Sequence, residues 1–144
     1  HNAINQFMQT TNWGDLDYMI VDLPPGTSDA PLTVMQVLNL DGFVVVTSPQ
    51  ELSKLDAKRS INMIRKLKIN VFGIVENFSG GIFGTGAGET LSEEMDLPFI
   101  GRIDMRPEYM DLKNPAVISN PLISAEYESL CSSLNQIVAT ISSN

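Results

Sequence analysis

The sequence predicts an α/β fold in which a parallel, doubly wound sheet has helices on both faces. Strand and helix patterns alternate along the 144 residues, and strand–helix–strand repeats with right-handed crossovers build such a sheet. The apolar segments expected as strands are short and do not alternate with polar residues, which is typical of parallel strands buried between two helical layers. No internal repeat or domain boundary is visible, so we expect a single unit.

The elements can be placed in order along the chain. Strands are expected at residues 18–21, 43–47, 71–75 and 99–103. Helices are expected at residues 31–40, 49–67, 89–95 and 125–141. The run Ser48-Pro49-Gln50-Glu51 is typical of a capping box and predicts a helix start directly after the strand at 43–47. In an open parallel sheet, this carboxyl edge is where ligands bind.

Charge and hydropathy argue against two classes of partner. The net charge of −8 disfavours nucleic acid, because affinity for phosphate backbones comes mainly from Lys and Arg. The longest apolar runs are far shorter than the roughly 20 residues of a membrane-spanning helix. After Lys113 the chain has no Lys or Arg, so its last helix lacks the cations of a membrane-binding tail. We therefore expect neither nucleic acid nor a membrane as a partner.

Cys131 is the single cysteine of the chain. It excludes a disulfide within the chain and a metal site built from several of its own thiolates. A lone thiol is typical of a reducing compartment, and we expect a cytoplasmic protein. The helical pattern around Cys131 predicts that it packs as a small apolar side chain.

The run DYMIVDLPPGTSD, residues 17–29, carries the clearest chemistry. An apolar strand that ends in Asp22 has the form of a Walker B element, whose carboxylate orients a water on nucleotide-bound Mg²⁺. The same pattern also fits an ordinary turn or helix cap. Pro24 and Pro25 stiffen the loop, and Gly26 exposes a backbone N–H that suits contact with a terminal phosphate.

Three runs together resemble Mrp-type P-loop ATPases of the Mrp/MinD/ParA superfamily. They are WGDLDYMIVDLPPGTSD, VVVTSPQELSKLDAKRSINMIRKLKINVFGIVENFSGG and IFGTGAGETLSEEMDLPFIGRI, in collinear order over nearly the whole chain. The resemblance implies a sheet of the P-loop NTPase kind, with residues 1–144 forming the C-terminal part of a single ATPase domain from the Walker B loop onward. It also implies a homodimer that uses ATP and Mg²⁺.

The resemblance assigns roles to three residues. Asp22 would act on Mg²⁺ through water, and Gly26 would belong to the loop that senses the γ-phosphate. Asn77 would hydrogen-bond the adenine ring, for which an amide offers both a donor and an acceptor. From its local sequence alone, Asn77 also fits a turn residue in the loop that continues through residues 78–81.

The chain departs from the family pattern in two places. No P-loop occurs in the 144 residues, and the run GTGAG at 84–88 is no substitute because no Lys follows it. We expect that run to be a flexible surface loop. The Cys-x-x-Cys that many Mrp proteins carry between VEN and IFG is also missing, and thiolates are the usual cluster ligands, which makes a bound iron–sulfur cluster doubtful.

The resemblance also implies that the P-loop strand lies between the strands at 18–21 and 43–47, so these two should not pair directly. Most catalytic residues are expected outside these 144 residues, and this chain alone is expected to be inactive.

Two functions remain open. The first is an ATP-hydrolysing Mrp-type protein associated with iron–sulfur cluster assembly or carriage. The alternative is a ParA/MinD-like regulatory ATPase switch that positions a protein partner and carries no metal. The missing Cys-x-x-Cys favours the alternative, whereas the closeness of DLPPGTSD and IFGTGAGE to Mrp favours the first. Both imply a client or regulatory protein as a partner.

Overall fold

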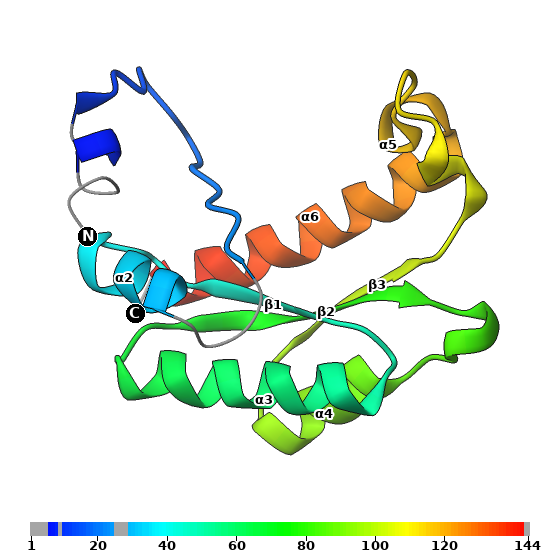
Figure 1. Ribbon diagram of the computed structural model, residues 1–144. Coiled ribbons are helices and arrows are strands. Elements are labelled where there is room, and N and C mark those ends of the chain that lie inside the picture. Colours follow the sequence, from blue (N-terminus) through cyan, green and yellow to red (C-terminus); the bar gives the residue numbers. More distant parts are fainter. Residues whose placement is uncertain (1–5, 9, 25–28, 143–144) are drawn as a thin grey trace.

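The computed structural model describes residues 6–8, 10–24 and 29–142, and it contains a parallel sheet flanked by helices (Figure 1). Within these residues the sheet has three strands in the order β1-β2-β3. The strands are β1 (Phe43–Thr47), β2 (Val71–Ser79) and β3 (Phe99–Asp104). Both neighbouring pairs are parallel, so the predicted fold class is confirmed.

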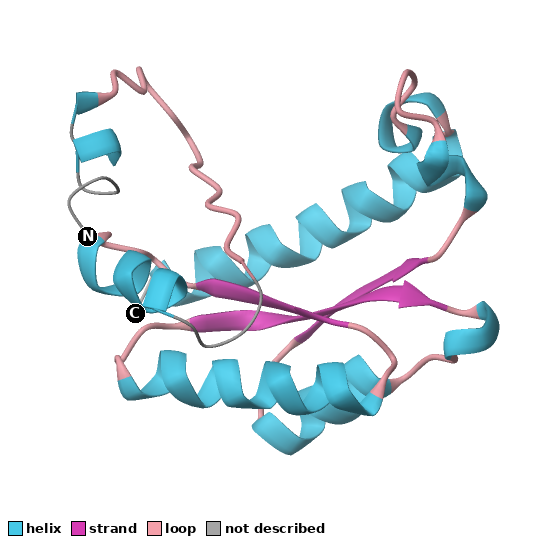
Figure 2. Ribbon diagram, in the orientation of Figure 1, coloured by secondary structure: helices cyan, strands magenta, loops and turns pink. Residues whose placement is uncertain are grey.

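Helices cover both faces of this sheet (Figures 1 and 2). Helices α3 (Glu51–Lys66) and α4 (Ala87–Met95) pack on one face, and α6 (Pro121–Ser142) crosses the other. The remaining elements are α2 (Asp29–Val37), η1 (Gly81–Phe83), η2 (Pro107–Met110) and α5 (Ala116–Ser119). None of the helices in the described ranges is long and apolar enough to cross a membrane.

The main core lies between the sheet and the layer of α3 and α4. Ile61 of α3, Ile74 of β2 and Leu91 of α4 are completely buried in it. The helical period turns Ala57, Ile61 and Ile64 of α3 to this side. Burying one such aliphatic side chain contributes about 1.5–3 kcal/mol. The core thereby fixes α4 against β2, whose carboxyl end carries the candidate site.

Three of the predicted strands are confirmed, and β2 continues beyond its predicted end to Ser79. The predicted strand at 18–21 is wrong. Residues 16–24 contain no strand, and the Ile20 side chain is 92% exposed. A strand needs a paired neighbour for its backbone hydrogen bonds, and the P-loop strand expected beside this segment is not among the 144 residues.

β1 is an edge strand in the described part of the chain, because it pairs with β2 alone. Val45 lies opposite Ile74 and is buried against α3. Val44 and Val46 point to the other face and are 36% and 59% exposed. The segment at 18–21 does not pair with β1, and because it forms no strand, the expected place of a P-loop strand between the two stays a prediction.

Three details of the helices differ from their predictions. The predicted capping box is wrong, because the Ser48 hydroxyl donates to Ser53 Oγ at 2.7 Å and α3 begins without a side-chain cap. The last helix begins earlier than expected, where Asn120 Oδ1 accepts the N–H groups of its first turn. Cys131 is exposed on this helix, so its predicted packing is also wrong.

Candidate functional site

The carboxyl ends of the three parallel strands meet at one edge of the sheet, where the connections to α3, α4 and η2 leave. Ligands bind at this edge in open parallel sheets. The end of β2 carries three polar residues in a span of four, Glu76, Asn77 and Ser79. These residues form the centre of the candidate site.

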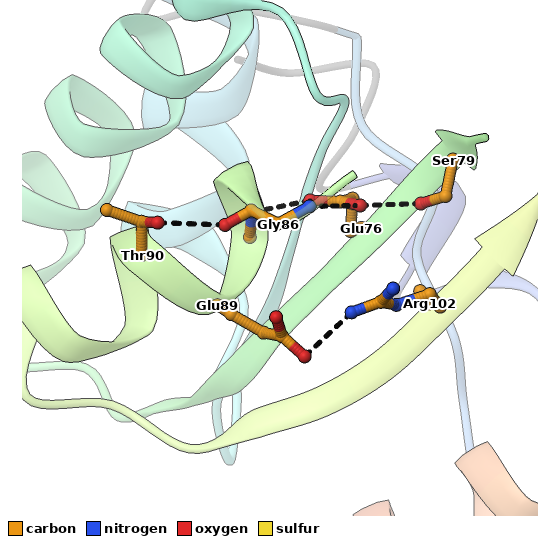
Figure 3. Close-up of polar contacts among 7 residues, drawn as sticks. Glu76, Ser79, Gly86, Glu89, Thr90 and Arg102 are labelled. Carbon is orange, nitrogen blue, oxygen red and sulfur yellow. Dashed lines mark hydrogen bonds and ion pairs between the residues drawn. The ribbon is translucent and has the colours of Figure 1, made fainter. Parts of the chain in front are cut away.

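Glu76 is a completely buried carboxylate that accepts hydrogen bonds from three groups (Figure 3). Its Oε1 accepts from the Ser79 hydroxyl at 2.7 Å and from the Gly86 N–H at 3.1 Å. Its Oε2 accepts from the Gly86 N–H at 3.0 Å and from the Gly88 N–H at 2.7 Å. The carboxylate thus joins β2 to the loop before α4 and to the first turn of that helix.

The surroundings of Glu76 favour its ionised form. Burial raises the pKa of the carboxyl group, but the hydrogen bonds from Gly88, Ser79 and Gly86 and the charge of Arg102 outweigh it, so the pKa lies below its usual value. The amino end of α4 adds to this effect, because unpaired N–H groups and the helix dipole attract a negative charge there. Glu76 is therefore an anion at neutral pH.

The Gly-rich run at 84–88 is only partly the predicted surface loop, because Gly84 and Thr85 are exposed whereas Gly86 and Gly88 are held by this carboxylate. Gly84 closes a tight turn by accepting the Gly80 N–H at 2.7 Å. Gly86 caps α4 in the left-handed region, at φ 99°. Gly88 is buried in the first turn of α4, and a Cβ there would lie 2.8 Å from Glu76 Cβ.

Asn77 lies at the predicted edge, in a bulge of β2. Glu76 is opposite Arg102 and Ser79 is opposite Asp104, so three steps along β2 face two along β3. Asn77 Oδ1 accepts the N–H of Phe78 at 2.9 Å, and Phe78 adopts a left-handed φ of 58°. Within the described residues no hydrogen bond from Asn77 Nδ2 is found, which leaves this donor for a ligand.

Of the other two predicted site residues, only Asp22 lies among the described residues. Asp22 is exposed on the segment that forms no strand, so its predicted position at the end of a central strand is wrong. Gly26 lies outside the described residues. In the part of the chain that the structure covers, no group of three or more His, Cys, Asp or Glu side chains could hold a metal ion.

The sequence reasoning missed Glu76 as a site residue. One signal was available, because a carboxylate directly follows the apolar run at 71–75 and precedes Asn77. A charge at the end of a strand buried on both faces needs several donors nearby. Those donors come from Gly86 and Gly88, which lie in a loop that the sequence pattern predicted as flexible.

The sequence is similar to those of known proteins. The family model described as "ParA: NUBPL iron-transfer P-loop NTPase" matches residues 1–142. An iron–sulfur cluster carrier protein of Synechocystis sp. is 41% identical over 99% of the chain and 44% of that protein. A cytosolic Fe-S cluster assembly factor of Saccharomyces cerevisiae is 34% identical over 95% of the chain and 52% of that protein.

A solved structure is similar as well. It is a nucleotide-binding protein from Archaeoglobus fulgidus in complex with ADP, with 37% identity and a TM-score of 0.68 over 77% of this chain and 50% of that one. The chain spans about half the length of the curated relatives it matches. The family model covers nearly all of the sequence, and the chain belongs to the ParA family of NUBPL iron-transfer P-loop NTPases.

Proposed function

We propose that the protein containing this chain binds and hydrolyses ATP with Mg²⁺ and serves iron–sulfur cluster assembly or carriage in the cytoplasm. The observation that carries the nucleotide part is the bulge at the end of β2, which presents the Asn77 amide at the ligand-binding edge of the sheet. The ADP complex of the similar structure and the iron–sulfur roles named for the relatives support this proposal.

The residues present suit a nucleotide. Asn77 Oδ1 already accepts the Phe78 N–H at 2.9 Å, so the Nδ2 group is the donor that the amide can offer to a ligand. That donor can pair with N1 of adenine, which accepts a hydrogen bond, whereas N1 of guanine carries a proton. Asp22 offers an exposed carboxylate suited to a water on Mg²⁺, a cation that keeps several of its waters. Bound ATP would supply the phosphoanhydride bond, and we assign the grip on its phosphates to Gly26 and to a P-loop outside these residues.

The iron–sulfur cluster enters this proposal as cargo. Cluster iron is usually held by several Cys thiolates, and this chain offers only Cys131. Cys131 is exposed on α6, which covers the face of the sheet away from α4. The connection between β2 and α4 contains no cysteine. One subunit of this chain would therefore contribute at most one thiolate to a cluster.

A regulatory switch is the second candidate. The connection after β2 carries an apolar residue, Ile82, that is 94% exposed, where a Cys-x-x-Cys would otherwise lie. An exposed apolar side chain suits contact with a protein rather than a metal. A ParA/MinD-like ATPase switch that positions a protein partner would use such a surface and carry no cluster.

We also propose a homodimer that engages a client or regulatory protein, and neither nucleic acid nor a membrane. Large apolar side chains are exposed at the carboxyl end of β2 and in the segments that follow the three strands. These side chains are Leu52, Phe78, Ile82, Met105 and Met110. Apolar side chains gathered at one edge are typical of protein interfaces. The net charge of −8 remains unfavourable for phosphate backbones.

In the full-length protein, Asp22→Asn is expected to lower kcat of Mg²⁺-dependent ATP hydrolysis about 10- to 100-fold, the usual loss for a residue that acts on a metal through an outer contact. ATP affinity should change much less, because base and phosphates are held elsewhere. Steady-state hydrolysis and calorimetric ATP binding measure the two effects. Asp17→Asn, a matched change in the same exposed segment, should leave both unchanged. Full turnover of Asp22→Asn would remove this carboxylate from the mechanism.

Anaerobic reconstitution of the full-length protein with iron and sulfide separates the two candidate functions. A cluster carrier should retain iron, acid-labile sulfide and a visible chromophore after desalting, whereas a metal-free switch should retain none. In either case Cys131→Ser is expected to leave the metal content unchanged, because one exposed thiol on a helix cannot complete a ligand set. A chromophore lost in Cys131→Ser would contradict this expectation.

A further inference from the structure

We propose that Glu76 is a positioning residue for the nucleotide, because it fixes the bulge that presents Asn77 at the edge of the sheet. The inference rests on the proposed function, in which Asn77 contacts adenine. Glu76 is completely buried and cannot contact a nucleotide itself. Its effect must therefore pass through its neighbours on β2.

The first step is a hydrogen bond between Glu76 and Ser79 across the bulge, which we call the clamp. Glu76 Oε1 accepts the hydroxyl of Ser79 at 2.7 Å, so the residues before and after the Asn77–Phe78 pair are joined by a side-chain hydrogen bond. The backbone of Ser79 is fixed from the other side, because its carbonyl accepts the Met105 N–H at 2.9 Å. With both ends held, the two residues between them have little freedom.

The second step is strain. Phe78 is held at φ 58°, a region that L-residues with large side chains rarely adopt. Such a conformation persists only where the surroundings over-determine it. Two hydrogen bonds supply this constraint. The Ser79 hydroxyl donates to Glu76 Oε1, and the Phe78 N–H donates to Asn77 Oδ1. Without the clamp, Phe78 can relax to negative φ, and the Asn77 amide would turn away from its position.

The third step explains why the clamp is a carboxylate. Three donors converge on Glu76, and two of them are the Gly86 and Gly88 N–H groups at the amino end of α4. A glutamine can keep both glycine N–H groups on its oxygen and donate from its NH₂ to Ser79 Oγ, but the Ser79 hydroxyl loses its acceptor and the charge that favours a helix amino end is absent. A leucine of similar size leaves all three donors without a partner.

The test compares Glu76→Gln and Glu76→Leu with the native full-length protein in binding of ATP and GTP. Glu76→Leu is expected to weaken ATP binding roughly tenfold or more, the effect of one misplaced hydrogen bond, and to leave GTP binding little changed. Selectivity for ATP over GTP should fall accordingly. The selectivity of Glu76→Gln should lie between that of the native protein and that of Glu76→Leu. A general loss of stability would not change this ratio. Hydrogen exchange of the Gly86 and Gly88 amides should accelerate in the same order.

Two further variants make the result decisive. Glu89→Gln removes a charge from the same turn of α4, where Glu89 pairs with Arg102 at 2.7 Å and does not touch the clamp, and it should preserve selectivity (Figure 3). Ser79→Ala breaks only the bond across the bulge and should lower selectivity as Glu76→Leu does. If Glu76→Leu does not fold, Ser79→Ala still tests the inference.

Asn77→Ala separates failure of the inference from failure of the proposed function. If Asn77→Ala lowers selectivity but Ser79→Ala and Glu76→Leu do not, the base contact stands and the positioning role of Glu76 is overturned. If the Glu76 and Ser79 variants weaken ATP and GTP binding equally, the role is merely structural and the inference is also overturned. If Asn77→Ala changes nothing, the proposed base contact is wrong and the inference falls with it.

Discussion

Gly73→Ala is expected to destabilise the fold by more than about 3 kcal/mol, through overpacking and an unfavourable backbone conformation together. Gly73 lies in β2 at φ 155°, and a Cβ there would lie 2.6 Å from the Pro98 carbonyl oxygen and 2.8 Å from Ile100 Cγ1. The same oxygen accepts the Ile74 N–H at 2.9 Å. The added methyl group would therefore force β2 and β3 apart where their pairing begins.

Gly101→Ala provides the matched control. Gly101 lies in β3 at φ 153°, so the backbone strain of the two substitutions is nearly the same. Its Cβ would collide with Leu130 Cδ2, which is the far end of a flexible side chain on α6. Leu130 can change rotamer, whereas the Pro98 carbonyl cannot move without disturbing the sheet. Urea unfolding should show a clearly larger loss for Gly73→Ala, and equal losses would contradict the backbone-contact argument.

Gly88→Ala is expected to destabilise the protein by about 1–3 kcal/mol, the usual effect of overpacking a filled space. A loss of stability would be informative, because alanine is favoured over glycine in a helix by about 1 kcal/mol and would ordinarily stabilise α4. Here the added Cβ would lie 2.8 Å from Glu76 Cβ and 3.0 Å from Phe99 Cε2. Either the carboxylate or the first turn of α4 must shift, which weakens the hydrogen bonds to Glu76.

Thermal unfolding and hydrogen exchange of the Gly86 amide measure this effect. Glu93→Ala, an exposed change in the same helix, should leave the melting temperature nearly unchanged and the Gly86 amide protected. A stabilised Gly88→Ala protein with a protected Gly86 amide would mean that the space around Glu76 adapts to a methyl group. The close approach of α4 to β2 would then not require glycine at position 88.

The difference between α3 and the segment at 18–21 shows what local pattern can and cannot predict. α3 has its own repeating apolar positions, Ala57, Ile61 and Ile64, and its backbone hydrogen bonds are internal. The segment at 18–21 is apolar throughout, but a strand obtains its hydrogen bonds from a neighbour. Whether residues 18–21 form a strand therefore depends on residues far from them in sequence, and their apolar pattern alone predicted a strand wrongly.

The sequence by itself determined the fold class, the positions of β1, β2 and β3, and the place of Asn77 near the end of a buried strand. These features follow from short apolar runs and from local motifs, which need no knowledge of distant contacts. Tertiary structure decided the role of Glu76. The physical reason is that a buried carboxylate is stable only where several donors converge, and Gly86 and Gly88 reach Glu76 only when α4 packs on β2.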